Sequence, residues 1–264
     1  MPVDQLEIFA LGYLWPFLRL SAMLMVAPVF GAGTVSVRIR VVLAALLSAL
    51  MAPMLPINPD IEFFSAPGIL MALREISIGL AMGFVMQMIF GAVVLAGQSI
   101  ATGMGLGFAM SVDPQNGVQV PIVSQIKVVI ATLLFLAIDG HLMLVSAVFE
   151  SFALVPLTDP GFAPTGFENL VSLGSQLFAS ALLLGLPTLT AVLMINVAFG
   201  VITRAAPQLN IFAVGFPVTI VVGLVFLFLG MPAFIAAMQR FFVACITQSW
   251  LAQGYGGEGG RRAD

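Results

Sequence analysis

Polar and charged side chains interrupt the longest apolar stretches of this sequence, and they are the first candidates for chemistry. They are Arg19, Arg74, Glu75, Gln87, Gln98, Lys127 and Asn196. A charge at the centre of an apolar helix costs about 2.5–3.5 kcal/mol on insertion scales, so each charged group needs a reason to be there. One hypothesis is a path for protons or ions. The simpler hypothesis, which we favour, is that these groups pair with neighbouring helices or with partner subunits. We expect intersubunit polar contacts at Arg74, Glu75, Gln87, Gln98 and Lys127.

Three of these positions carry a geometric expectation of their own. Arg74 and Glu75 are adjacent, so on a helix their side chains point about 100° apart and each needs a separate partner. Lys127 lies about two turns inside its apolar segment. Its aliphatic stem can therefore be buried while its ammonium snorkels to water.

Asp139 and His141, in "LAIDGHLML", have the residue types of an acid–base pair. His141 is the only histidine of the chain, and no Ser or Cys nucleophile accompanies the pair at a recognisable spacing. A helix terminus with Gly140 near its C-cap explains the pattern more simply. One histidine and scattered carboxylates also form no metal cluster. We therefore predict no catalytic, metal or cofactor site, and no enzyme activity.

Glycines recur at every second position in "ATGMGLGFAMSVDPQNGVQVP" (residues 101–121). A phosphate-binding loop is excluded, because no GK[ST] follows and no strand precedes. Gly103, Gly105 and Gly107 let the backbone leave helical geometry, and Asp113-Pro114 and Asn116-Gly117 are turn signals. Irregular backbone at membrane depth is tolerated only inside protein or along a cavity. The stretch is thus predicted to be a re-entrant loop or a pore constriction.

The composition indicates which elements must position these residues. The chain has 264 residues, 61% hydrophobic and 8% charged, with a mean hydropathy of +1.14. Soluble domains carry about 25% charged residues, so this is an integral membrane protein. Its apolar runs are long and do not alternate as in an outer-membrane barrel, so the fold class is all-α. The net charge of −3 gives no reason to expect a nucleic-acid partner, and the single Cys245 excludes an internal disulfide.

Apolar regions predict about six helical segments of a polytopic protein. They cover about residues 6–30, 41–57, 66–100, 118–138, 170–200 and 211–236. A helix needs about 20 apolar residues to cross a bilayer, so the third region is much too long for a simple span. We expect it to tilt, break or fold back as a hairpin. The places to bend are Gly79, Gly83, Gly91 and Gly97.

Charges between the regions predict an orientation. Basic residues near 31–40 and at Arg204 place those connections in the cytoplasm and the N-terminus outside, by the positive-inside rule. The connection 139–169 holds acidic residues and no Lys or Arg, which favours the outside. Six spans would leave the C-terminus outside, whereas the basic residues after 237 favour the inside. Either residues 237–250 partly re-enter, or the segments are not conventional spans.

Four motifs, in register over about residues 10–250, resemble the FliR family of flagellar export proteins and the related SctT proteins of injectisomes. They are "VAPVFGAGTVSVRIRVVLA" (Val26–Ala44), "REISIGLAMGFVMQMIF" (Arg74–Phe90), "LAGQSIATGMGLGFAMSVDPQNGVQVP" (Leu95–Pro121) and "LFLAIDGHL" (Leu134–Leu142). The resemblance favours the flagellar branch over the injectisome branch. At Lys127 the family would lead us to expect an apolar or neutral residue.

The resemblance implies a structural, channel-forming subunit of the type III export gate in the bacterial inner membrane, at the flagellar basal body. FliP-like, FliQ-like and FlhB-like subunits would be its partners, and unfolded export substrates would pass through the helical assembly. Residues 1–138 would be a FliP-like part and 170–250 a FliQ-like helical hairpin and end. The acidic outer connection 139–169 would join them, and 251–264 would be a flexible tail.

The same resemblance implies that the glycine-rich stretch is a pore plug, with the closest match from Leu106 to Gly117, and we predict the plug to be residues 103–117. Its members would be Gly103, Gly105, Leu106, Gly107, Phe108, Met110, Asp113, Pro114 and Gly117. A polytopic secondary transporter for a small solute is the alternative from another class. Such transporters carry inverted repeats with paired broken helices, and we find no such repeat in this sequence.

Overall fold

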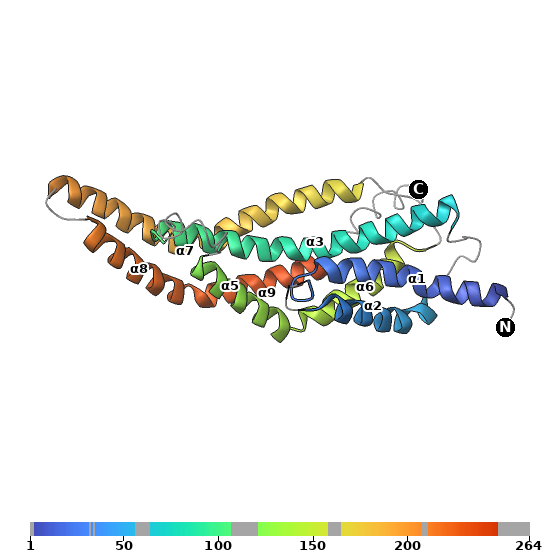
Figure 1. The fold of residues 1–264 in the computed structure, drawn as a ribbon. Helices are drawn as coiled ribbons and strands as arrows, with labels where there is room; N and C mark the ends of the chain where they lie inside the picture. The colour runs from blue at the N-terminus through green and yellow to red at the C-terminus, as the bar shows by residue number, and fades with distance from the viewer. Residues whose placement is uncertain are drawn as a thin grey trace, which may run out of the picture. The chain divides into compact units, whose positions relative to one another are not determined.

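Helices are the only regular elements in the part of the chain that the computed structural model describes, which is residues 3–31, 33, 35–55, 64–106, 121–157, 165–206 and 211–247 (Figure 1). The long helices are α1 (Val3–Val26), α3 (Ala66–Gly103), α7 (Thr165–Ala205) and α8 (Ile211–Leu229). The shorter ones are α2 (Val37–Met51), the 3-10 helix η1 (Ala52–Met54), α5 (Ile122–Ala137), α6 (Gly140–Leu154) and α9 (Met231–Thr247). The predicted all-α class is confirmed.

Several of these helices are long and apolar enough to cross a membrane. Within the described residues, three qualify alone: Val37–Met54, Ala66–Gly103 and Phe178–Ala205. Two further pairs qualify when each is taken as one broken span: α5 with α6, and α8 with α9, the latter bent by 53°. The chain is therefore a polytopic membrane protein with three to five candidate spans.

The third apolar region neither breaks nor folds back, so that part of the prediction is wrong. It forms α3, one continuous helix of 38 residues. Such a helix is about 57 Å long, against a hydrocarbon core of about 30 Å, so it must tilt strongly or extend beyond the bilayer. At least one glycine that we expected to bend α3 serves packing instead. A Cβ on Gly79 would lie 2.1 Å from the carbonyl oxygen of Arg19, so α1 approaches α3 where α3 has no side chain.

The first compact unit comprises Met1–Met88, Asp139–Gly174 and Val243–Asp264. Its described core comes from α1, α3 and α6. The buried members include Trp15, Leu20, Met23, Leu24, Met71, Met86, Leu144, Val148 and Phe152. Against α1 packs α2, and the Tyr13 hydroxyl donates a hydrogen bond to the carbonyl of Ala45.

The second compact unit comprises Ile89–Ile138 and Ser175–Phe242. Three aromatic rings from three helices meet in its core. The ring centroids of Phe90 and Phe135 are 6.2 Å apart, and Phe242 lies 5.7 Å from the first and 5.2 Å from the second. Offset and edge-on aromatic pairs at such distances stabilise a core beyond their buried area. Each unit combines segments from both predicted parts, so the units do not test the division, and the FliP-like and FliQ-like parts stay a prediction.

Residues 139–169, predicted to be a connection, contain the helix α6. Asp139 has the left-handed backbone conformation, with φ of 56°, and separates α5 from α6. Gly140 is the first residue of α6 and not a C-cap glycine, so that interpretation was wrong in detail. The side of the membrane on which this stretch lies stays a prediction.

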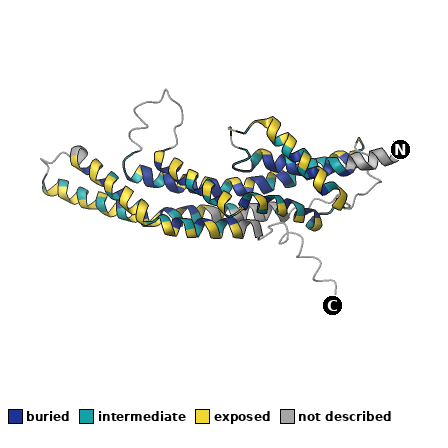
Figure 2. Ribbon diagram, turned by 90° about the horizontal axis from the view of Figure 1, so that it is seen from below, coloured by how far each residue is buried: buried dark blue, intermediate teal, exposed yellow. Residues whose placement is uncertain are grey.

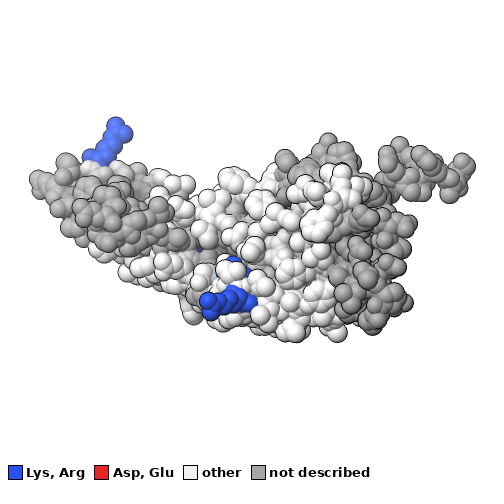
Figure 3. All heavy atoms as spheres, turned by 45° about the vertical axis from the view of Figure 1, so that its right-hand side comes forward, with Lys and Arg blue, Asp and Glu red and all other residues white. Residues whose placement is uncertain are grey.

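Exposed apolar side chains cover much of the helix surface (Figure 2). On α7 they include Phe178, Leu182, Leu183, Leu193, Met194 and Val197, and on α8 they include Val221, Leu224, Val225, Phe228 and Leu229. The face drawn in Figure 3 is uncharged over most of its described area, with isolated basic side chains. A surface of this kind is suited to lipid or to apolar partner helices, and not to water.

Candidate functional site

A buried ion pair joins α1 to α3 in the first unit. The Nε of Arg19 donates to one carboxylate oxygen of Glu75 at 2.7 Å, and a terminal nitrogen donates to the other at 3.0 Å. Both side chains are fully buried. This two-point geometry is the strong form of an arginine–carboxylate contact.

The rest of the Arg19 guanidinium is bound by the end of α6. One terminal nitrogen donates to the Ser151 hydroxyl at 2.8 Å, and the other also donates to the Val155 carbonyl at 3.3 Å. The ring of Phe152 lies 3.8 Å from the guanidinium carbon, a cation–π distance. Arg19 therefore ties α1, α3 and α6 together. A cation held by so many fixed partners is suited to a structural role and not to passing protons.

Arg74 and Glu75 have separate partners, as predicted. Arg74 donates from both terminal nitrogens to the Pro156 carbonyl, at 3.3 and 3.4 Å, while Glu75 faces Arg19. Both partners belong to this chain, so the burial of these two groups needs no other subunit. An intersubunit role for them stays a prediction.

The predicted amides and Lys127 lie in different surroundings. Gln87 and Gln98 are exposed on α3, where a partner helix can reach them. Lys127 is only 3% exposed, and its Nζ lies 4.8 Å from the centre of the Phe234 ring. The expectation that Lys127 snorkels to water is wrong. Lys127 lines a pocket that is bordered by Pro187 inside α7 and by Gly230 after α8.

The predicted plug begins at a well-defined helix end in the second unit. The Leu106 N–H donates to the Ala101 carbonyl and the Gly105 N–H to the Thr102 carbonyl, both at 3.0 Å. Gly105 has φ of 80°. This is the Schellman arrangement, in which a left-handed glycine ends a helix. Gly103 is the last residue of α3. Most of the plug lies outside the described residues: Gly107, Phe108, Met110, Asp113, Pro114 and Gly117.

Two helices hold this end of α3. Asn196 of α7 donates from Nδ2 to the Gly103 carbonyl at 3.0 Å. The Thr219 hydroxyl of α8 lies 3.4 Å from the Met104 carbonyl, and its shorter bond, at 3.0 Å, is to the Phe216 carbonyl of its own helix. Both carbonyls belong to the last turn, where a helix leaves acceptors without intrahelical donors. A Cβ on Gly105 would lie 2.2 Å from the Phe216 ring, so α8 also packs directly on the turn.

The start of the plug segment and the first turn of α5, which follows it, share one buried apolar cluster. Its buried members are Ile100, Ala101, Met104, Val123 and Val192. Ile100 and Ala101 precede the segment, and Met104 lies at its start. Val123 follows it on α5, and Val192 is on α7. The described residues on the two sides of 107–120 therefore pack in the same cluster.

No group of three metal-ligating side chains occurs among the described residues, and Asp139 and His141 gather no further catalytic group there. Asp139 is exposed, and His141 is on the first turn of α6.

Comparison with known proteins gives the family. The sequence profile described as "Bacterial export proteins, family 1" matches residues 10–244. The flagellar biosynthetic protein FliR of Escherichia coli (strain K12) is 40% identical over 212 residues, covering 80% of this chain and 81% of that protein. FliR of Pectobacterium carotovorum is 39% identical over 220 residues, covering 83% and 84%. FliR of Bacillus subtilis (strain 168) is 28% identical over 234 residues, covering 88% and 90%. The chain belongs to the FliR family.

Membership of the FliR family, together with the apolar helices, makes this chain a membrane-embedded component of a flagellar export apparatus. The four motifs that carried the resemblance cover most of α3 and the junction of α5 with α6. Glu75 and the glycines at the end of α3 belong to these motifs, whereas the residues that contact them lie elsewhere in the chain.

Sequence reasoning missed several partners that complete these sites. Ser151, Thr219 and Phe216 are ordinary residues of apolar helices, and a hydroxyl there commonly bonds its own helix, so it gives no signal. Arg240 is one of the basic residues after 237, and in the sequence it indicated only on which side of the membrane the C-terminus lies. It lines the same pocket as Lys127.

Proposed function

We propose that this chain is a structural, channel-forming subunit of the flagellar type III export gate, without catalytic activity. In this proposal unfolded flagellar proteins cross the bacterial inner membrane through an assembly with FliP-like, FliQ-like and FlhB-like subunits, at the basal body. The FliR relatives are all flagellar by name, which favours this branch over the injectisome.

Residues 103–117 are, in this proposal, the plug that closes the path at rest. The observation that carries it is the anchored end of α3. The Gly103 carbonyl accepts a hydrogen bond from Asn196, and the Thr219 hydroxyl lies 3.4 Å from the Met104 carbonyl. Gly105 then turns the chain out of the helix. A plug must return to one place after each opening, and flanking residues packed in one apolar cluster support such a return. The glycine backbone at 105 and 107 gives freedom to move.

The polar groups divide into two kinds in this proposal. Arg19 and Glu75 hold the first unit together, whereas Gln87 and Gln98 are exposed amides on an apolar face and are suited to contacts with neighbouring subunits. An exposed amide in lipid would lack partners, so a polar group of another subunit would satisfy it.

Deletion of residues 107–113 tests the plug directly. The assembled complex should then pass small ions at rest, measured as dye release or as membrane depolarisation in whole cells, while FliP-like and FliQ-like subunits still co-purify. Deletion of the seven residues 257–263 in the polar tail is the matched control and should leave the membrane tight. A tight membrane with normal assembly after the first deletion would show that this loop is not the seal.

A further inference from the structure

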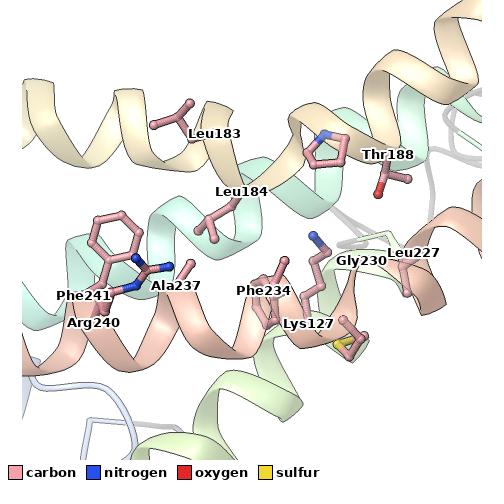
Figure 4. Close-up of a pocket in the computed structure, with 13 residues that line it drawn as sticks. Lys127, Leu183, Leu184, Thr188, Leu227, Gly230, Phe234, Ala237, Arg240 and Phe241 are labelled. Carbon is pink, nitrogen blue, oxygen red and sulfur yellow. The ribbon is translucent and has the colours of Figure 1, made fainter.

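The second unit contains a pocket of about 460 Å³ that the plug does not use (Figure 4). It is formed by α5, α7, the end of α8 and α9. Two helix irregularities border it. Pro187 lies inside α7, and Gly230 separates α8 from α9 at their 53° bend. A proline within a helix leaves the carbonyl four residues earlier without its donor, here that of Leu183, which also lines the pocket.

The charge of the pocket is entirely positive. Lys127 and Arg240 are among its thirteen lining residues, and no Asp or Glu is. Arg240 donates from Nε to the Ala236 carbonyl at 3.2 Å. The Lys127 Nζ lies 4.8 Å from the centre of the Phe234 ring, and no carboxylate of the described residues lies within ion-pair distance of it. A buried ammonium without a counter-charge is costly, so an anion from outside the chain would stabilise the site.

The rest of the lining selects the kind of anion. Apart from Lys127, Arg240 and the Thr188 hydroxyl, the lining is apolar or glycine. A small hydrophilic anion would leave that surface uncovered, whereas a ligand with a hydrocarbon chain would cover it. Beside the pocket, α7 exposes Leu183 and Leu186 on a surface suited to lipid. Pockets of about 300–1,000 Å³ hold small ligands, so the volume admits a headgroup and the first part of one chain.

We propose that this pocket binds an anionic phospholipid of the surrounding bilayer. Its phosphate accepts hydrogen bonds from the Lys127 ammonium, Arg240 adds positive charge to the same lining, and an acyl chain lies along the leucines of α7. Basic pockets between membrane helices commonly bind anionic headgroups. The lipid would bridge α5, α7 and α9 where two of these elements are interrupted, which would stabilise the second unit without any partner subunit.

The test measures lipid retention on the full chain, co-expressed and purified with its partner subunits. The complex is incorporated into nanodiscs of phosphatidylglycerol and phosphatidylcholine in equal amounts, extracted into detergent and examined by native mass spectrometry. The wild type should keep phosphatidylglycerol in preference to phosphatidylcholine. Lys127→Met should reduce the retained phosphatidylglycerol about tenfold, as expected for loss of one charge-assisted hydrogen bond. Arg240→Gln should reduce it less, because Arg240 is exposed.

Two controls keep the result interpretable. Arg204→Gln removes an exposed cation of the same unit outside the pocket and should leave retention unchanged. Lys127→Arg keeps the charge and should restore most of the retention, which separates lipid binding from misfolding.

Equal retention by wild type and Lys127→Met would overturn the proposal, as would equal retention of the two lipids by the wild type. Loss of a partner subunit from Lys127→Met with unchanged lipid would also overturn it, by assigning the pocket to a partner's carboxylate. The ion-leak assay of the plug deletion is independent of all these outcomes.

Discussion

Arg19 and Glu75 lie 56 positions apart in the sequence and form a fully buried, two-point ion pair between α1 and α3. The pair stands at a close approach of the two helices, where the Arg19 carbonyl meets Gly79. Ser151 and Val155 accept hydrogen bonds from two further guanidinium protons. Burial of two charges is tolerated here because nearly every donor and acceptor of the pair has a partner.

Removal of one charge from this pair should destabilise the protein strongly. Glu75→Gln leaves Arg19 buried with a neutral partner, and we expect a loss of about 3–5 kcal/mol in the free energy of unfolding. Resistance to proteolysis and the melting temperature in detergent measure it. The double variant Arg19→Met with Glu75→Met should recover much of the loss, since apolar residues of similar size can replace a buried pair. Ser77→Ala, which removes only a hydroxyl bound to its own helix, should change little.

Gly105→Ala should displace the start of the plug. The residue has φ of 80°, and a Cβ there would lie 2.2 Å from the Phe216 ring. A left-handed alanine alone costs about 1–2 kcal/mol, and the ring must also move. We expect a higher resting ion leak and a lower melting temperature. Gly103→Ala is the matched control, because its added methyl would lie 3.4 Å from Val192, an ordinary contact. Equal leakage from both variants would contradict the anchoring role of Gly105.

The side-chain amide of Asn196 should matter through its donor. Asn196→Ala removes a hydrogen bond to the Gly103 carbonyl, worth about 0.5–1.5 kcal/mol, and should raise the resting leak modestly. Asn196→Asp should raise it more, since a carboxylate facing a carbonyl cannot donate. Thr190→Ala, on the same helix, removes only a bond to the Leu186 carbonyl and serves as control. If Asn196→Asp leaks no more than Asn196→Ala, the contact does not hold the end of α3.

The fold class and the family could be predicted from the sequence, because they depend only on the composition and on the order of the motifs. The unbroken course of α3 was not predictable. The same glycines permit either a bend or a close helix contact, and only Arg19 on α1 decides between them at Gly79. Likewise, the distance of Lys127 from the end of its helix suggested access to water. The depth of that side chain depends on α7 and α9, which come far later in the chain.

Accessibility of the end of α7 tests the predicted orientation. Arg204 and Ala205 are exposed, and the positive-inside rule places them in the cytoplasm. In a Cys245→Ser background, Ala205→Cys should react with a membrane-impermeant thiol reagent only after the inner membrane is opened. Glu150→Cys, exposed on α6 in the acid-only stretch, should react in intact spheroplasts. The reverse pattern of labelling would invert the topology.

Substitution of two glycines of α3 separates packing from flexibility. Gly79→Ala would place a methyl 2.1 Å from the Arg19 carbonyl oxygen and 3.0 Å from the Ala22 Cβ, so α1 would have to move away. That movement also stretches the ion pair of Arg19 with Glu75, and we expect a loss of about 1–3 kcal/mol in the free energy of unfolding, as for overpacking in a core.

A methyl on Gly91 meets nothing within 4 Å. Gly91→Ala should therefore raise the melting temperature, since alanine favours a helix by about 1 kcal/mol over glycine. Equal melting temperatures for the two variants would show that α1 does not approach α3 at Gly79. A lower value for Gly91→Ala alone would show that α3 needs a bend there after all.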